Sequence, residues 1–560
     1  MRFALNSNAT SIPRSAILDL GYWIAKKIYS SHVFRDIPRS IRRFLGGRKI
    51  LIVGGGEIGT EIGIVAYNRG WKVRAIVFQD PARRKSSEQT PSPIRRLPWY
   101  IEPRLSQSID FSSTCEQPME EEPFLFTHLP ELKNLDALQK CILNEMPDIV
   151  LLEDMFLGAK EWEDLYIRTQ IVLKEKQISK RIIFLPSPEE QDACEDEICS
   201  DIFLSKVHMK KFLTKIQLAD RMLGKENDVI LIDKLKKELD YKEKKEQWKR
   251  IDDAVRNHGK VILKPESTSS GHGQLVISDS SALKRKDIER SEAYQDLRTR
   301  TNRYVLEKYV ENRTEACLIV AKVAKGKSAC INRIYYKKYD VDKPLPPRLQ
   351  GMTRLAYSET KKGQDNDLWL EMDDIATTIH ARLAVPFLYI EFIIDNDAFE
   401  RKQGKYIFIN EISYRPDDAG FVTQISHEKN QFDLFMDSLD NLLDNPERKK
   451  SLAKPSFIKL KDEYVSRTMV PKKPIQFIPA RLFFDCMWVR KEKQLKLRLY
   501  EKFLGTGGRE VDYGRIIGYM FHHKSRTREQ AIELLRSYEG AIGLTKETID
   551  LLIEALPEME

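Results

Sequence analysis

A short apolar segment that runs directly into a glycine-rich turn constrains the fold of this chain more than any other feature. Residues Lys49–Val53 form the apolar run, Gly54–Gly59 follow with G-x-G-x-x-G spacing, and Thr60–Asn68 then show helical spacing. A second apolar strand, Val73–Phe78, comes after Gly70. A strand, a glycine turn, a helix and a strand in this order predict a doubly wound, parallel α/β unit.

The elements that follow this unit are predicted from the spacing of apolar residues. Segment Gln79–Pro123 shows no clean period and is rich in Pro, Ser and charge, which indicates an insertion or a loop in the first domain. The other elements that we expect in this domain are a helix at Leu132–Asn144 and strands at Ile149–Leu152 and Arg181–Leu185.

The middle of the chain has an α+β pattern. Charged helices are expected at Ser205–Leu223 and Lys234–Asn257, and strands at Val261–Lys264, Leu275–Ser278, Arg303–Val310, Ala316–Val323 and Ala329–Tyr336. Near the end, strands are expected at Pro479–Phe484 and Leu495–Tyr500, followed by a helix that begins with the capping-box pattern Thr527–Gln530.

Composition excludes several classes of protein. The 560 residues carry a net charge of +9 and are 41% hydrophobic, which is typical of a globular protein and excludes disorder and collagen. No run approaches the ~20 apolar residues that a membrane-spanning helix needs. Seven cysteines without a C-x-x-C pair argue against a disulfide scaffold or a structural zinc site and favour a reducing compartment.

Nearly all of the excess charge lies in the N-terminal arm. Residues Met1–Lys49 contain ten Lys or Arg and two acidic residues, so the arm alone carries +8 and the remaining body is almost neutral. A nucleic-acid-binding body would show a basic stripe, so we expect no nucleic-acid partner. The amphipathic stretch Ile17–Tyr29 and the basic Arg35–Arg43 fit an organelle transit peptide, a membrane-surface helix or a helical arm packed on the body.

A strand delivers Lys264 into a small polar loop, Pro265–Gln274. Gly271 and Gly273 let backbone N–H groups approach oxygen anions closely, and Ser269 and Ser270 add hydroxyl donors, as a phosphate-binding loop requires. Lysine at the end of the strand would neutralise phosphate charge. The alternative is a plain β-hairpin turn with a surface lysine.

Two glutamates lie on consecutive predicted strands. Alternation over Phe387–Asp395 places Glu391 on one face of its strand. Alternation over Lys405–Glu411 places Glu411 on the same face as Ile407 and Ile409. A hairpin centred near residue 401 would set the two carboxylates opposite each other, where like charges repel and require a cation. Mg²⁺ is the natural candidate because it accepts one or two carboxylates and completes its shell with water and phosphate. Two independent lysine partners are the alternative.

A loop with one guanidinium and two acids follows directly, at Arg415–Gly420. Arg415 has the planar fork that binds a carboxylate or the oxygens of a phosphoryl group in transfer, and Asp418 could position an amine. The same residues could instead form a type I turn that Asx hydrogen bonds hold together.

These motifs, in this order, resemble the ATP-grasp superfamily, and within it the formate-dependent phosphoribosylglycinamide formyltransferases and related enzymes of purine synthesis. The resemblance extends from about Lys49 to Gly543. It is strongest at Lys260–Ile277, Arg303–Glu315 and Tyr406–Leu439. It implies an ATP-grasp fold, α/β and α+β, with a doubly wound domain before the ATP-grasp domain and a small β-rich domain after it.

The resemblance also implies site residues, which we expect in four groups. ATP contacts are implied for Lys210, Lys264, Ser269, Ser270, Gly271, His272, Gly273 and Gln274, for the adenine-reading strand Glu307, Lys308, Tyr309 and Val310, and for Glu315 at the ribose. Magnesium ligands are implied for Glu391 and Glu411, and catalytic roles for Arg415 and Asp418. Substrate contacts are implied for Glu57, Ile58, Glu153, Asp418, Lys502 and Arg515.

The chain departs from the formyltransferase pattern at several positions. His272 replaces the lysine of the glycine loop, and Arg515 followed by Ile516 replaces a pair of arginines. The segment 79–123 and the basic arm have no counterpart. We therefore expect ATP and Mg²⁺ binding first, and leave open a different carboxylate or amine, or a nucleotide-binding protein without turnover. A nicotinamide oxidoreductase, suggested by Gly54–Gly59 and Asp80, leaves the glutamate pair unexplained.

The expected organisation is an arm at residues 1–48, a first α/β domain at 49–200 with 79–123 inserted, an ATP-grasp domain at 201–450 and a C-terminal domain at 451–560. The implied reaction joins a small carboxylate to an amine through an acyl phosphate, with release of ADP and phosphate. We expect a cytoplasmic homodimer, with organelle targeting or membrane-surface attachment through the arm as alternatives.

Overall fold

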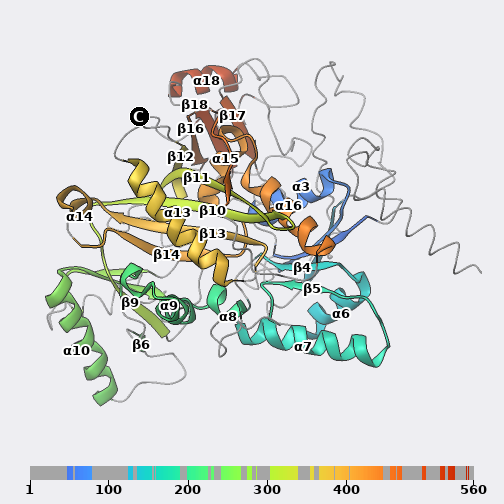
Figure 1. Cartoon of the computed structure of the whole chain (residues 1–560), viewed down its shortest axis with the longest axis horizontal. Helices are drawn as coiled ribbons and strands as arrows, with labels where there is room; N and C mark the ends of the chain where they lie inside the picture. Colours follow the sequence, from blue (N-terminus) through green and yellow to red (C-terminus); the bar gives the residue numbers. More distant parts are fainter. Residues whose placement is uncertain are drawn as a thin grey trace, which may run out of the picture.

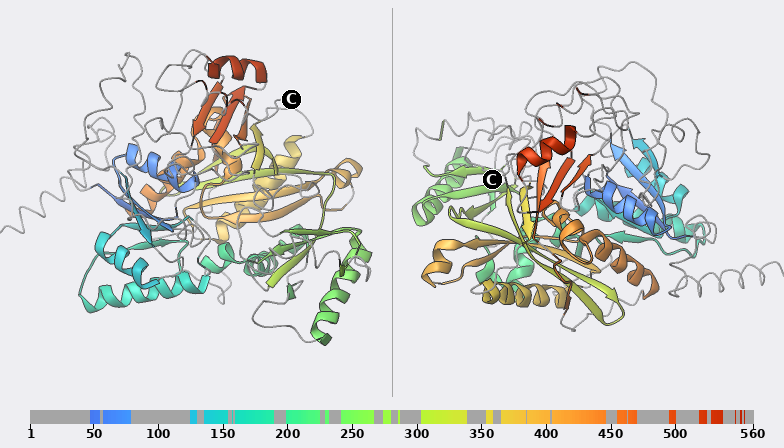
Figure 2. Two further views of the ribbon diagram at one scale, coloured as in Figure 1. Left: turned by 180° about the vertical axis from the view of Figure 1, so that it is seen from behind. Right: turned by 90° about the horizontal axis from the view of Figure 1, so that it is seen from above.

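The computed structural model contains three β-sheets with helices packed against them (Figure 1). The parallel sheet lies on one side of the molecule, the smallest sheet on the other, and the largest sheet between them (Figures 1 and 2). The structure describes residues 47–54, 57–78, 124–129, 135–153, 157, 159–188, 199–224, 229–231, 241–266, 274–279, 285–286, 303–338, 353–358, 365–383, 385–402, 404–445, 455–461, 463–469, 495–499, 518–523, 527–536, 546, 550 and 553.

The first domain is the parallel α/β unit that the sequence predicts. Its strands are buried on both sides by helices and therefore read as continuous apolar runs. Gly54, at the end of the first strand, has a φ of 133°, a conformation that side-chain-bearing residues rarely adopt. The sheet has the order β3-β2-β1-β4-β5, with β1 at Lys49–Val53, β2 at Lys72–Phe78, β3 at Phe124–Leu129, β4 at Ile149–Leu152 and β5 at Ile183–Leu185. Its helices are α3 at Glu57–Asn68, α6 at Leu135–Glu145 and α7 at Ala159–Glu175.

The smallest sheet is antiparallel and has one long helix packed against it. Trp248 and Ile251 of this helix join a core with Val261, Leu263 and Leu306 of the sheet. The order is β6-β9-β7-β8, with β6 at Val229–Leu231, β7 at Val261–Pro265, β8 at Leu275–Ile277 and β9 at Arg303–Lys308, and the helix is α10 at Tyr241–His258.

The largest sheet contains nine of the described strands, and the C-terminal strands belong to it. Strand β12 pairs with β16, so the sheet continues from the middle of the chain into its last part. The order is β14-β13-β10-β11-β12-β16-β18-β17, with β15 beside β11. The strands are β10 at Arg313–Ala324, β11 at Lys327–Lys338, β12 at Thr353–Ser358, β13 at Phe387–Asp395, β14 at Ile407–Ser413, β15 at Ser456–Phe457, β16 at Tyr464–Met469, β17 at Leu495–Leu499 and β18 at Gly518–His523.

Helices cover the two faces of this sheet differently. Trp369 of α13 stacks against Tyr335 with ring centroids 5.3 Å apart, and Phe435 of α16 stacks against Phe387, which belongs to the opposite face, at 5.2 Å. The α16 face carries the candidate site. The remaining elements are α8 at Cys199–Leu204, α9 at Lys206–Lys215, η2 at Ala219–Arg221, α13 at Asp365–Arg382, α14 at Asn396–Arg401, η4 at Asp418–Val422, α15 at Thr423–Ser426, α16 at Gln431–Asp444 and α18 at Arg528–Arg536.

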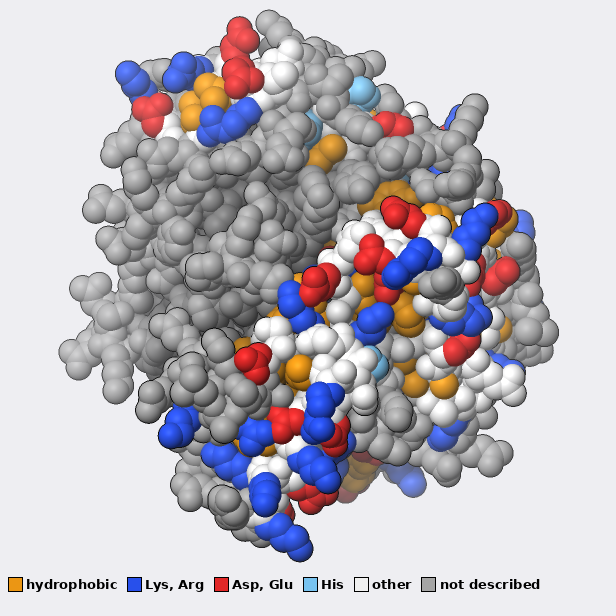
Figure 3. Space-filling view, turned by 90° about the vertical axis from the view of Figure 1, so that its left-hand side faces the viewer, with side chains coloured by type: hydrophobic (Ala, Val, Ile, Leu, Met, Phe, Trp, Pro, Cys, Tyr) orange, Lys and Arg blue, Asp and Glu red, His pale blue; other side chains and the backbone are white. Residues whose placement is uncertain are grey.

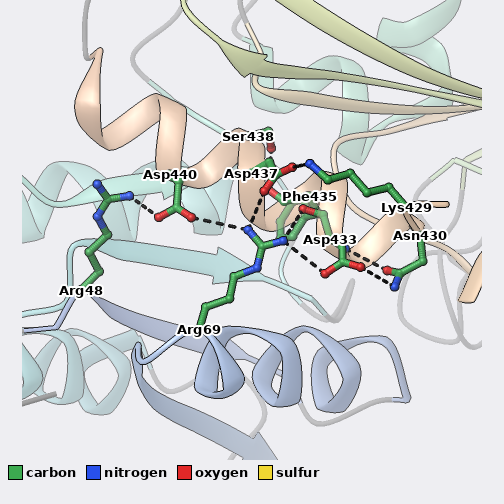
Figure 4. Close-up of polar contacts among 9 residues, drawn as sticks. All are labelled: Arg48, Arg69, Lys429, Asn430, Asp433, Phe435, Asp437, Ser438 and Asp440. Carbon is green, nitrogen blue, oxygen red and sulfur yellow. Dashed lines mark hydrogen bonds and ion pairs between the residues drawn. The ribbon is translucent and has the colours of Figure 1, made fainter. Parts of the chain in front are cut away.

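Charged groups attach α16 to the first domain (Figure 4). Arg69, just after α3, forms ion pairs with Asp437 at 2.7 Å and Asp433 at 3.2 Å, and Arg48 contacts Asp440. Apolar residues of the first domain and of the largest sheet also belong to one continuous core. The first domain is therefore held directly against the helix that covers the site face.

One predicted helix is shorter than expected, and one cap is confirmed. The helix predicted at Ser205–Leu223 is α9, which ends at Lys215 because Gln217 adopts a left-handed φ of 64°, and η2 follows. At α18, the amide N–H of Gln530 donates to the Thr527 hydroxyl, and the amide N–H of Thr527 donates to the Gln530 side chain, which confirms the capping box.

Several sequence predictions lie outside the described residues: residues 1–46 of the N-terminal arm, the segment 79–123 and the strand predicted at 479–484. On the face drawn in Figure 3, basic and acidic side chains of the described residues are interspersed. Across the described part of the chain, no helix has both the length and the apolar character that crossing a membrane requires.

Candidate functional site

Two lysines from different elements meet at one buried carboxylate. Lys210 Nζ, on α9, lies 2.8 Å from Glu307 Oε1, and Lys264 Nζ, on β7, lies 2.6 Å from Glu307 Oε2. All three side chains are buried. Burial alone would raise the pKa of Glu307, but the two ammonium groups outweigh it and hold that pKa well below its usual value, while burial lowers the pKa of Lys264.

The pairing of β7 with β9 explains why these side chains meet. Ile262 lies opposite Glu307 and Lys264 lies opposite Val305, while Leu263 and Leu306 point into the core with α10. Successive side chains of a strand alternate between faces. Lys264 and Glu307 therefore share the face away from α10, where α9 adds Lys210.

Glu391 and Glu411 lie directly opposite each other in the β13–β14 pair, as predicted. The predicted alternation of β14 is wrong, however. Ile409 pairs with Phe392 and Glu411 pairs with Glu391, so one residue, Asn410, is inserted between the two pairings. This β-bulge puts Ile409 and Glu411 on opposite faces, because an extra residue shifts the alternation by one position.

Asn410 links the lysines to the glutamate pair. Lys264 Nζ donates to Asn410 Oδ1 at 2.8 Å, and Asn410 Nδ2 donates to Glu391 Oε2 at 2.9 Å. Lys206, on α9, lies 3.6 Å from Glu411. Three cations and three carboxylates thus form one cluster between two sheets, and sequence reasoning did not assign Asn410 or Lys206 to it.

The donor set suits Mg²⁺. No group of three or more His, Cys, Asp or Glu side chains that could hold a metal occurs among the residues that the structure describes. Mg²⁺ does not need one, since it binds through one or two carboxylates and takes its other ligands from water and substrate phosphate. The opposed oxygen donors of Glu391 and Glu411 fit that requirement.

Glu315, near the start of β10, is a buried carboxylate with a cationic partner. Arg313 Nε lies 2.9 Å from Glu315 Oε1, and its guanidinium lies 4.8 Å from the centre of the Tyr309 ring. Burial opposes the charge of Arg313, but Glu315 and Tyr309 raise its pKa. The backbone N–H of Lys308 donates to Leu223 O and that of Tyr309 donates to Lys260 O.

A small apolar cluster lies where β9 leads into β10. It brings together residues from four separate segments: Leu223, Val310, Ile393 and the half-buried Phe408. Pockets that hold small ligands are lined mainly by apolar side chains of this kind. Only Val310 was predicted, because long-range packing of this kind leaves no local motif.

The loop after β14 begins a 3₁₀ helix and not a type I turn. Asp417 is its N-cap and accepts from Asp418 N at 2.6 Å. Burial, together with Glu391 and Glu411, raises the pKa of Asp417 to about 6 against the opposing effect of Arg415. The sequence prediction named Asp418, the first residue of this 3₁₀ helix, and its role stays a prediction.

Arg415 joins this loop to the first domain. Its guanidinium is buried and donates to Pro416 O at 3.0 Å. Burial opposes its charge, but Asp417 and then Glu153 raise its pKa. The adjacent Tyr414 hydroxyl donates to the carbonyl of Leu152, the last residue of β4. The ends of β4 and β14 are thereby brought together.

The predicted substrate residues of the first domain lie at the same junction. Glu153 follows β4, is buried, and packs so closely on Gly59 that a Cβ there would meet its carboxylate carbon at 3.1 Å. The Ile58 side chain is buried in the core, so a substrate contact from this position would come from its backbone. Of Glu57 the structure describes only the backbone, as the first residue of α3.

Some predicted site residues remain predictions. Gln274 lies just before β8. Outside the described residues lie Ser269, Ser270, Gly271, His272, Gly273, Lys502 and Arg515.

Comparison with known proteins agrees with this arrangement. Residues 238–432 match the model of the ATP-grasp domain. The chain contains an ATP-grasp domain. That match covers β7, β9, β13 and β14, which carry Lys264, Glu307, Glu391 and Glu411.

Curated relatives of this chain are distant. It is 26% identical over 200 residues to the formate-dependent phosphoribosylglycinamide formyltransferase of Prochlorococcus marinus, covering 35% of this chain and 44% of that protein. It is 22% identical over 412 residues to the enzyme of the same name from Saccharolobus solfataricus, covering 70% of this chain and 76% of that protein. The chain thus spans less than half the length of the first of these relatives.

A solved structure shows the same fold over most of both chains. The carboxyaminoimidazole ribonucleotide synthase of Aspergillus clavatus, complexed with ATP, superposes with a TM-score of 0.51 at 14% identity and covers 91% of this chain and 99% of its own. The mixed architecture, with a parallel N-terminal sheet and antiparallel sheets beyond it, is therefore that of ATP-grasp enzymes.

Proposed function

We propose that this ATP-grasp protein is an ATP- and Mg²⁺-dependent ligase that joins a small carboxylate to an amine through an acyl phosphate. The observation that carries the proposal is the cluster of Lys210, Lys264 and Glu307 beside the opposed Glu391 and Glu411. The lysines offer charge to phosphate oxygens, and the two glutamates offer ligands to the cation that accompanies them.

The reaction has two steps. A carboxylate oxygen attacks the γ-phosphorus of ATP, the bond to the bridging oxygen breaks, and ADP leaves. The amine nitrogen then attacks the acyl carbon, phosphate leaves, and the nitrogen gives its extra proton to a carboxylate base. Mg²⁺ held by Glu391 and Glu411 would supply charge neutralisation at the phosphate oxygens.

The chain's own residues would orient the two substrates. Arg415, buried between Asp417 and Glu153, is suited to hold an anionic oxygen in the first step. Burial raises the pKa of Asp417 to about 6, which makes it a candidate, beside Asp418, for accepting a proton from the amine near neutral pH. Glu153 lies at the junction where an amine from the first domain would approach.

Formate and phosphoribosylglycinamide are the first substrates to test, because two curated relatives carry that activity in their names. His272 in place of the loop lysine, and the single Arg515, favour a divergent carboxylate or amine as the second candidate. The matched domain is the reason to rank both above a nicotinamide oxidoreductase, which a titration with NAD(P) tests directly.

The experiment is a screen for ADP release with pairs of acids and amines, in the presence of ATP and Mg²⁺. We expect release that requires both partners and that Glu391→Gln abolishes. Release with formate and phosphoribosylglycinamide supports the specific assignment, and release with another pair supports the class alone. Nucleotide binding without release for any pair would instead indicate a non-catalytic nucleotide-binding protein.

A further inference from the structure

Asn410 occupies a position that the regular geometry of a strand would not give it. If β14 alternated without interruption, Asn410 would lie on the face opposite Glu411, toward α13. The register shift between Glu391 and Phe392 inserts Asn410 as an extra residue. Its side chain consequently reaches Glu391 on the same face as Glu411. Bulges next to functional sites commonly re-aim a side chain in this way.

The side-chain amide of Asn410 separates two charges that would otherwise pair. Its oxygen accepts from Lys264 and its nitrogen donates to Glu391, the only assignment of the amide that suits an ammonium on one side and a carboxylate on the other. Lys264 is already neutralised by Glu307 at 2.6 Å. A neutral amide between Lys264 and Glu391 satisfies both groups without cancelling the charge of the carboxylate.

We propose that Asn410 is a positioning residue that couples nucleotide binding at Lys264 to cation binding at Glu391. This inference rests on the proposed ATP- and Mg²⁺-dependent function. Asn410 fixes the Glu391 carboxylate at a set distance from the lysine and leaves it negative. A nucleotide phosphate at Lys264 and a cation at Glu391 are then held close enough to contact each other, so each binds better when the other is present.

Binding of ADP with and without Mg²⁺, measured by isothermal titration calorimetry on the full chain, tests the coupling. The variants are Asn410→Ala and Asn410→Leu, the second of which keeps the volume and guards against collapse of the bulge. We expect the ratio of ADP affinities with and without Mg²⁺ to fall about tenfold, as for the loss of a hydrogen bond to a charged group. Metal-free ADP affinity should stay within about threefold of the wild type, because Lys264 keeps its partner Glu307.

Asn441→Leu is the matched control. Asn441 is a half-buried asparagine on α16 whose side chain donates to the Lys322 carbonyl at 3.0 Å, away from the glutamate pair. Its replacement also removes an amide hydrogen bond, so it reports any general loss of stability. The ratio of affinities should not change in this variant.

The outcomes separate this inference from the function beneath it. A wild-type chain that binds no ADP under either condition overturns both. A wild type whose ADP affinity depends on Mg²⁺, with a ratio that Asn410→Ala and Asn410→Leu leave unchanged or that Asn441→Leu lowers equally, overturns the role of Asn410 alone. A wild type that binds ADP equally well with and without Mg²⁺ likewise overturns the coupling. In that case the ADP-release screen still tests the proposed function.

Discussion

The side-chain amide of Gln431 holds the backbone of Asp417 with two hydrogen bonds. Its Nε2 donates to the carbonyl oxygen of Asp417 at 2.8 Å, and the backbone N–H of Asp417 donates to its Oε1 at 3.3 Å. Gln431 is the first residue of α16 and is fully buried. The same amide fills the space beside Gly420, where a Cβ would lie 1.9 Å from Oε1. The loop that faces the glutamate pair is thus fastened to α16.

Gly420→Ala should therefore damage the site through a steric clash with Gln431 and not through a strained backbone conformation. The new methyl group must displace the Gln431 amide, which costs about 1–3 kcal/mol of folding stability, as other overpacking changes do. Release of the amide frees Asp417, so ADP release should fall by at least about tenfold. Urea unfolding and the ADP-release assay measure the two effects.

A double-mutant cycle supplies the control for this change. In a Gln431→Ala background the space beside Gly420 is open, so Gly420→Ala should cost clearly less stability there than in the wild type. Equal costs in both backgrounds would show that the contact between Gly420 and Gln431 is not the reason for the glycine.

Arg69→Met should loosen the first domain from α16 (Figure 4). Burial opposes the charge of Arg69, but Asp437, Asp433 and Asp440 raise its pKa, so its removal leaves three carboxylates near one another with less compensation. We expect a loss of about 2 kcal/mol, less than the ~3–5 kcal/mol for breaking a fully buried pair, because the Arg69 side chain is partly exposed. Thermal unfolding at low salt is the measurement.

Arg168→Met is the matched control for this prediction. Arg168 also contacts two aspartates, Asp164 at 2.9 Å and Asp136 at 3.1 Å, but on the exposed surface of α7. Surface ion pairs contribute only ~0–1 kcal/mol, so its loss should barely change the unfolding temperature. If both variants were equally mild, the contact between Arg69 and α16 would not stabilise the domain arrangement.

The sequence predicted those parts of the fold and site that depend on local pattern. The Lys49–Val53 strand with its glycine turn led to the parallel sheet, because apolar runs and glycines act within a few residues. The opposition of Glu391 and Glu411 was also predicted, from a hairpin centred near residue 401, although the bulge at Asn410 overturns the alternation predicted for β14. An inserted residue has no signature in a pattern of apolar and polar residues.

Contacts between distant segments were beyond the sequence. The pairing of β12 with β16, and the approach of Lys210 to Glu307, depend on how separate elements pack, which local spacing does not encode. The conformation of the loop at Asp417 was missed for a similar reason. It is held by the Gln431 side chain, which bonds the backbone of Asp417 from fourteen residues away.

Glu307→Gln should destabilise the nucleotide-free protein and do so less when nucleotide is bound. Without this carboxylate, Lys210 and Lys264 remain buried near each other with no negative partner between them, which costs about 3 kcal/mol. Phosphate oxygens bound at the lysines would restore much of that compensation. The unfolding temperature of the variant, compared with the wild type, should therefore recover partly on addition of ADP.

Glu311→Gln is the control for this measurement. Glu311 is an exposed glutamate four residues away that pairs with Lys260 at 2.6 Å. Its replacement should change the unfolding temperature neither with ADP nor without it. A deficit in Glu307→Gln that is equally large with and without ADP would argue that these lysines do not receive phosphate.

His380 makes the stability of the sheet depend on pH. It is buried on α13, and burial, followed by the nearby Lys322 ammonium, lowers its pKa to about 3. In the unfolded chain a histidine has a pKa of about 6.5. Between these values the unfolded state binds one proton more than the folded state, so the free energy of unfolding falls as the pH falls.

His380→Gln removes this contribution. Between pH 7 and pH 5 the neutral histidine costs the wild type about 2 kcal/mol, so the variant should lose about 2 kcal/mol less over the same interval. Urea unfolding at a series of pH values measures the difference, with His258→Gln, at an exposed histidine, as the control. Parallel pH profiles of wild type and His380→Gln would mean that His380 takes up a proton in the folded protein as readily as in the unfolded chain.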